Sequence, residues 1–206
     1  MIEPTPPPPE EEGSGGSPDQ ASTDPIALED LAAVVRVPGL YRKIERVLHS
    51  MRESFELPDD FPMQLVSEEP GDRVHEYGLY WQDAQRLLRL FAGMTWGASG
   101  YDPLWEVRVE AQPPFKPEWL RQSGLHRQAA RRAESRFSEW DHFWHEDKTE
   151  EAFLVGASAA CTRFLEEPDP DATAAEYLAG ALHSLCVSGA LHALIEAAVE
   201  AARKHR

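Results

Sequence analysis

The chain has 206 residues, and its 36 acidic and 20 basic side chains give a formal net charge of −16. A surface this acidic repels a phosphate backbone, so nucleic acid is disfavoured as a partner. The two cysteines, Cys161 and Cys186, are too few for a disulfide framework and have no zinc-type spacing. Because no basic segment followed by an apolar run opens the sequence, we expect a cytoplasmic protein.

The first part of the chain is rich in proline and acidic residues. Residues 1–31 hold eight acids and no base, and Ile2 is the one large aliphatic residue before Asp24. Such a segment buries too little apolar surface to offset the entropy lost on ordering the backbone. We therefore predict a disordered leader over residues 1–24, followed by a single globular domain over residues 25–206.

Helical patterns follow the leader. Asp24-Pro25 is typical of a helix start, and Pro38-Gly39 predicts a break. Apolar residues then recur every three or four positions from Leu40 to Phe55, which predicts a second helix of about four turns. The proline- and acid-rich stretch 61–72 is expected to be a surface loop.

The middle of the chain changes to a period of two. In LWEVRVE, residues 104–110, the charged Glu106, Arg108 and Glu110 alternate with apolar residues, which predicts a strand with one solvated, charged face. Residues 75–82 alternate in the same way. Residues 83–96 fit both a helix and a strand; the strand is favoured, which gives a three-stranded antiparallel meander.

The C-terminal half is predicted to be helical. One helix is expected over residues 118–145, a second over residues 149–165, and a final helix from Asp171 or Thr173 with a bend near Gly189. The expected fold is therefore α+β, with a small antiparallel sheet of two or three strands packed against four to six helices. The alternative, if residues 83–96 are helical, is a mainly α fold.

The final helix contains nineteen residues without a formal charge, residues 177–195. This length is close to the ~20 residues that cross a bilayer, but histidine and serine interrupt it, so a buried helix is favoured over a membrane span. Its apolar surface is a candidate for homo-oligomer formation if one core cannot cover it; the leucines concerned are Leu182, Leu185, Leu191 and Leu194.

One short segment, EWDHFWHE, concentrates metal-ligating side chains: Glu139, Asp141, His142, His145 and Glu146. On a helix, residues three and four apart lie on one face, and Glu-x-x-His is half of a carboxylate-bridged two-metal site. The sequence has no second Glu-x-x-His. The segment makes a metal-dependent hydrolase or oxidase an alternative function, with a divalent metal as the one cofactor considered.

A nuclease-like site is a further alternative. Asp102 and Glu106 could bind magnesium beside Arg108. Against this, an arginine stays protonated and cannot act as the base that such a site needs.

A basic segment offers a recognition surface, since arginine makes bidentate contacts with carboxylates. It comprises Arg121, Arg127, Arg131, Arg132 and Arg136. Neutralisation by the acidic leader or by the acids of residues 166–171 is the internal alternative. The leading functional hypothesis is a non-enzymatic protein–protein interaction or regulatory module that uses these arginines, the acidic surface, or both.

Overall fold

The computed structural model describes residues 28–66, 71–73, 76–96, 103–134, 140–141 and 153–205. Contacts within the chain separate two units, Met1–Val37 and Pro38–Arg206. The second unit contains the sheet and all helices except the N-terminal part of the first. The predicted leader, residues 1–24, lies outside the described residues.

The sheet of the second unit is antiparallel throughout and has the order β1-β3-β4-β5-β7-β6, with β2 also paired to β3. Its strands are β1 (Met63–Leu65), β2 (Gly71–Arg73), β3 (Glu76–Asp83), β4 (Leu88–Thr95), β5 (Leu104–Ala111), β6 (Trp140–Asp141) and β7 (Phe153–Ala160). The α+β class fits, and the β3–β4–β5 meander is as predicted. The predicted sheet of two or three strands is wrong, because the described residues alone form a sheet of seven strands.

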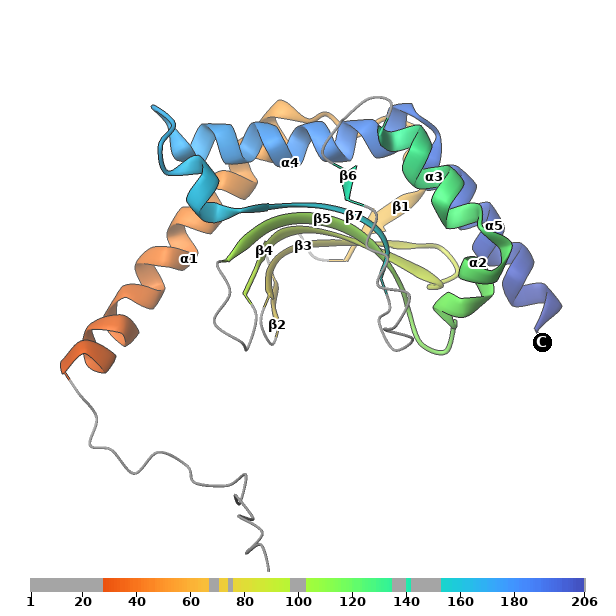
Figure 1. Ribbon diagram of the computed structural model, residues 1–206, viewed down its shortest axis with the longest axis horizontal. Coiled ribbons are helices and arrows are strands. Elements are labelled where there is room, and N and C mark those ends of the chain that lie inside the picture. The colour runs from red at the N-terminus through yellow and green to blue at the C-terminus, as the bar shows by residue number, and fades with distance from the viewer. Residues whose placement is uncertain are drawn as a thin grey trace, which may run out of the picture. The chain divides into compact units, whose positions relative to one another are not determined.

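The helices are α1 (Leu28–Ser54), α2 (Pro117–Ser123), α3 (Leu125–Glu134), the 3-10 turn η1 (Cys161–Phe164), α4 (Pro170–Val187) and α5 (Ala190–Lys204). In the second unit, α4 lies along the convex face of the curved sheet, whereas α2, α3 and α5 gather near one end of the strands (Figure 1). The concave face points away from α4.

Three predicted boundaries are wrong. The α1 helix continues through Pro38-Gly39, where proline removes one backbone hydrogen bond without ending the helix. The helix expected over residues 118–145 is split at Gly124, which has a φ of 70°, and α3 ends at Glu134. The expected loop 61–72 contains the short strand β1 and the first two residues of β2, and both strands form hydrogen bonds with the edge of β3.

The helix predicted over residues 149–165 is also wrong, because residues 153–160 form β7. Alanines make this segment look helical, but helix propensities differ by less than about 1 kcal/mol per residue. Strand β7 pairs along most of its length with β5, Val107 facing Ala157. The hydrogen bonds between β7 and β5 and the burial of small side chains outweigh the local preference of the alanines for a helix.

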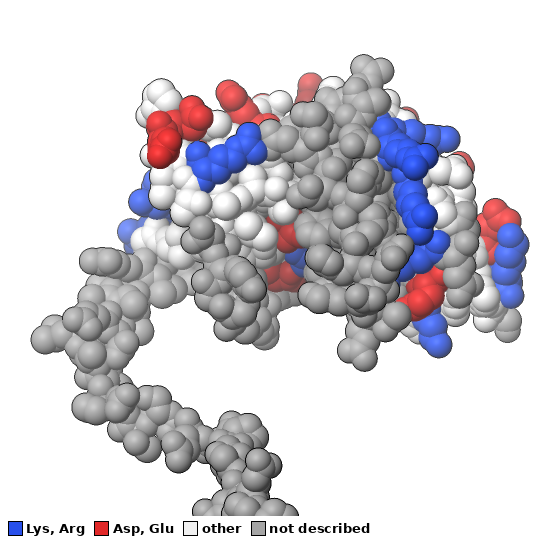
Figure 2. Space-filling view, in the orientation of Figure 1, with Lys and Arg blue, Asp and Glu red and all other residues white. Residues whose placement is uncertain are grey.

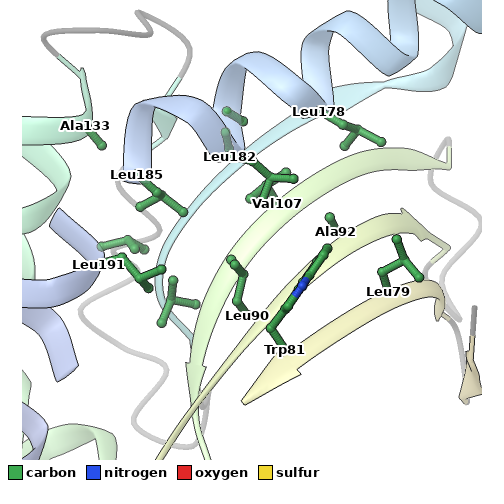
Figure 3. Close-up of a cluster of buried hydrophobic side chains, with 14 of the residues drawn as sticks. Leu79, Trp81, Leu90, Ala92, Val107, Ala133, Leu178, Leu182, Leu185 and Leu191 are labelled. Atoms are coloured by element: carbon green, nitrogen blue, oxygen red, sulfur yellow. The ribbon is translucent and has the colours of Figure 1, made fainter. Parts of the chain in front are cut away.

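The core lies between the convex face of the sheet and the helices. Leu79 and Trp81 of β3, Leu90 and Ala92 of β4, and Val107 of β5 face Leu178, Leu182 and Leu185 of α4 (Figure 3). Leu182, Leu185, Leu191 and Leu194 are each 0% exposed. The chain itself covers the four leucines that were expected to offer an apolar surface, so they cannot form an oligomer interface without rearrangement.

The helices α4 and α5 meet at a break. Gly189 has a φ of 68°, which suits glycine, and the two helix axes differ by 59°. The bend predicted near Gly189 is confirmed. Within the described ranges no single helix is long and apolar enough to cross a membrane; α4 and α5 taken together pass that test of length and composition, but as a bent pair.

Candidate functional site

Three exposed arginines lie along α3. Arg127 and Arg131 are four residues apart and therefore share a helix face, and Arg132 lies beside them. The other side of the helix carries Ala129 and Ala133, which are 1% and 0% exposed and belong to the core. Basic side chains gather on the part of the surface where α3 lies (Figure 2). We call Arg127, Arg131 and Arg132 the arginine face.

The two other predicted arginines are not part of this face. Arg121 is half-buried in the last turn of α2, and Arg136 lies outside the described residues. Arg131 and Arg132 also occupy the last turn of α3, where positive charge interacts favourably with the helix dipole. Arg131 and Arg132 therefore also contribute to the stability of α3.

A second group of charges lies on the concave face of the sheet, which is the face opposite α4. We call Glu76, Arg89, Glu106, Arg108 and Glu110 the buried charge cluster. Arg108 is 3% exposed, and its Nη1 donates to Glu106 Oε2 at 2.7 Å. Its Nε donates to Glu110 Oε2 at 3.3 Å, and its Nη2 pairs with Glu76. Arg89 pairs with the second oxygen of Glu110.

Strand register brings the cluster together. Phe91 faces Arg108 and Arg89 faces Glu110 across the β4–β5 ladder, while Glu76 comes from β3. The guanidinium of Arg108 lies 4.4 Å from the centre of the Phe91 ring, a favourable cation–π distance. The cluster therefore spans three strands and binds them through charge as well as through backbone hydrogen bonds.

Burial changes the acid–base behaviour of two members. Loss of water raises the pKa of Glu106 above its ordinary value, although Arg108 pulls it in the other direction. Burial would lower the pKa of Arg108, but the carboxylates of Glu106, Glu110 and Glu76 outweigh it and raise that pKa. Three carboxylates around two guanidiniums leave one excess negative charge when all are ionised.

The prediction that Glu106, Arg108 and Glu110 share a face is confirmed, but the predicted solvation of that face is wrong: they are 5%, 3% and 3% exposed. The nuclease-like arrangement gains no support, because the Arg108 guanidinium already binds both Glu106 and Glu110. Asp102 lies outside the described residues.

The predicted metal ligands Glu139, His142, His145 and Glu146 also lie outside the described residues. Asp141 belongs to β6, so helical spacing, on which the proposed site depended, does not hold at this position. No group of three or more metal-ligating side chains occurs within the described part of the chain. Of the two thiols, Cys186 has its pKa raised to about 12 by burial and by Asp60, which disfavours the nucleophilic thiolate.

Sequence reasoning missed Glu76 and Arg89 as members of the buried charge cluster. Alternation along each strand places both on the concave face, but the partners depend on strand order and register, which one sequence does not reveal. No family model matches the chain, and searches of curated proteins and of solved structures found no similar protein.

Proposed function

We propose that the chain is a non-enzymatic interaction module whose arginine face binds an acidic surface of a protein partner. The observation that supports this most is the exposure of three arginines on one helix whose other side is anchored in the core. A helix fixed in this way presents its side chains in a constant geometry. Arginine also binds carboxylates through two parallel hydrogen bonds, which adds specificity to charge.

The net charge of −16 does not oppose this proposal. At physiological salt the Debye length is about 8 Å, so charges farther away are largely screened. Binding of a partner then depends mainly on the charges of the arginine face. The rest of the surface is acidic and repels acidic partners that approach it elsewhere. The arginine face would thus select both the partner and its orientation.

The test is a charge reversal, Arg127→Glu with Arg131→Glu, measured with a fluorescent ten-residue polyglutamate peptide at two salt concentrations. Arg42→Glu with Lys43→Glu is the matched control, since both residues are exposed on α1 and the charge change is identical. We expect salt-sensitive binding to the unchanged chain and an affinity loss of about tenfold or more in the α3 variant alone, because two attractions become repulsions.

Equal losses in both double variants would mean that only net charge matters and would refute the arginine face as the site. Absence of measurable binding at low salt would refute it as well. A single-stranded DNA of the same charge provides the remaining comparison: tighter binding to DNA than to the peptide would contradict a protein partner.

A further inference from the structure

The strand β1 leaves one side of its backbone without a neighbouring strand. It ends the sheet, at the far edge in Figure 1, and β3 is its one partner among the described strands. The Val66 N–H donates to the Tyr80 carbonyl, so in this antiparallel ladder the backbone groups of Gln64 also face β3. Those of Met63 and Leu65 face outward, and within the described part of the chain no other segment hydrogen-bonds to them. Both N–H groups and both carbonyls are thus open to an added strand.

Little in the sequence protects this edge against strand addition. Natural proteins keep such edges short or place a charge on them. The strand β1 is short, which limits the length of an added strand, but residues 63–66 carry no charge and Val66 is 57% exposed. Pro62 limits the edge on its N-terminal side, because proline has no N–H to donate. An added strand would therefore bind along residues 63–66.

A pocket lies beside this edge on each face of the sheet. Leu65 pairs with Trp81 and Gln64 with Gln82, so the two pairs point to opposite faces. Leu65 and Trp81 line a pocket of about 250 Å³ with largely apolar residues of α1 and α4. Gln64 and Gln82 line a second pocket of about 310 Å³, which is more polar. Side chains of an added strand alternate between the faces and would enter the two pockets in turn.

The surroundings of the edge on the helix side are acidic. Glu56 and Arg52 both line the apolar pocket, and exposed Asp59 and Asp60 precede β1 in the chain. The Asp60 carbonyl lies 3.2 Å from the His192 ring of α5, which places this turn on the helix side of the sheet. Two paired copies of the chain would bring these acids together, in addition to a net charge of −16 on each copy. Charge complementarity instead favours a basic segment of another protein.

We propose that β1 binds an extended basic segment of a partner protein as an added antiparallel strand, the orientation of every described strand pair. An apolar side chain of the segment enters the pocket beside Leu65, and basic side chains two residues away lie near Glu56 and Asp60. Neutral polar side chains between them face Gln64 and Gln82. A cavity of about 150 Å³ can hold benzene, so the apolar pocket has room for a leucine side chain. The inference is independent of the arginine face, since no described residue of α3 lines either pocket.

The probe is the peptide acetyl-Lys-Thr-Leu-Thr-Lys-amide, in which the leucine and the two lysines share one face. In an antiparallel pair with β1, their N–H groups point toward β1 and those of the threonines point away. N-methylation of the leucine therefore blocks the paired edge of the peptide. N-methylation of the second threonine is the matched control, because mass and charge are the same. Hydrogen exchange of the Met63 and Leu65 amides reports binding to the unchanged chain.

We expect both amides to exchange about fivefold more slowly at a peptide concentration of about four times the dissociation constant, by mass action. The leucine-methylated peptide should bind about tenfold more weakly or worse, because it loses a hydrogen bond and its methyl group meets the edge. The threonine-methylated peptide should bind like the unmodified one. Glu56→Lys should weaken binding about threefold or more, whereas Glu196→Lys, the same change at an exposed site on α5, should have little effect.

Equal losses from the two N-methylations would show that the peptide does not pair with the edge and would overturn the proposal. The absence of slower exchange at Met63 and Leu65 with millimolar peptide would do the same. Equal effects of Glu56→Lys and Glu196→Lys would overturn the choice of a basic segment. In sedimentation of the chain alone, a dimer that the peptide dissociates would make a second copy the occupant of the edge, against the proposal.

Discussion

Arg108 shows how a buried charge can be tolerated. Its guanidinium has three carboxylate partners and an aromatic ring beneath it, so its donors are satisfied where water is excluded. Such a group contributes little net stability compared with an apolar core, yet loss of one partner is costly because the remaining charges stay buried. We therefore expect the cluster to favour one strand register more than it adds to the free energy of unfolding.

Glu106 makes the stability of the fold depend on pH. Its pKa is raised from the ordinary value of 4.5 by burial, so the folded chain holds this proton more tightly than the unfolded chain. The contribution is fully present below pH 4.5 and is lost as pH rises through the folded pKa. In Glu106→Gln this loss cannot occur. We expect the stability of the unchanged chain minus that of the variant to fall as pH rises above 4.5 and then to level off.

Urea unfolding at a series of pH values from about 4.5 to 8 measures this difference. Glu196→Gln, which removes an exposed acid on α5, controls for the change in net charge. If the difference instead rises with pH, attraction to Arg108 prevails over burial, and the pKa of Glu106 is lowered in the folded chain.

A pair of glycines faces each other between the strands β3 and β4. Gly78 faces Gly93 in the ladder, and a Cβ atom on Gly93 would lie 2.6 Å from the Gly78 Cα and 2.8 Å from the Phe91 ring. Neither neighbour can move freely, since one is backbone and the other lies under Arg108. The two glycines thus make room for the ring that supports the buried charge cluster.

Substituting Gly93→Ala should lower the free energy of unfolding by about 1–3 kcal/mol or more, because overpacking forces the strands apart. Gly39→Ala is the matched control: nothing lies within 4 Å of its Cβ position, and it is in α1. That change should be neutral or stabilising by up to about 1 kcal/mol. Thermal or urea unfolding of both variants tests this, and equal effects would contradict the close approach of β3 and β4.

Elements with a clear period were predictable, and those whose state depends on distant pairing were not. Strand β5 shows strict alternation of charged and apolar residues, so its strand conformation and the residues on each of its faces could be predicted from the sequence. Strand β7 consists largely of small residues with no clear alternation, and its state is set by pairing with β5. The burial of Glu106 was missed because alternation identifies the two faces of a strand but does not say which face contacts solvent.

At the scale of the whole sheet, chain order and spatial order diverge at β7. Strands β3, β4 and β5 are neighbours in both, but β7 lies between β5 and β6 after two helices intervene. Local patterns cannot specify this insertion, which explains why the sheet was predicted too small. That Arg127 and Arg131 share a helix face was predictable, because helical spacing within one segment is enough to place them together.

The division of contacts at Val37 leads to a prediction about the chain as a whole. Among the residues whose burial the structure describes, every member of the core cluster lies after Pro38, beginning with Ile44, so we expect the core to form without residues 1–37. Removing them also takes away eight acids and one base, which lowers the self-repulsion of a chain whose net charge is −16.

We expect the chain of residues 38–206 to unfold cooperatively in urea, with a free energy of unfolding within about 1 kcal/mol of that of the full chain. The slope of this free energy against urea concentration should be unchanged, since it reports the surface exposed on unfolding. A markedly lower slope or a loss of cooperativity would show that the N-terminal segment completes the core, and the division at Val37 would then not mark the limit of the folding unit.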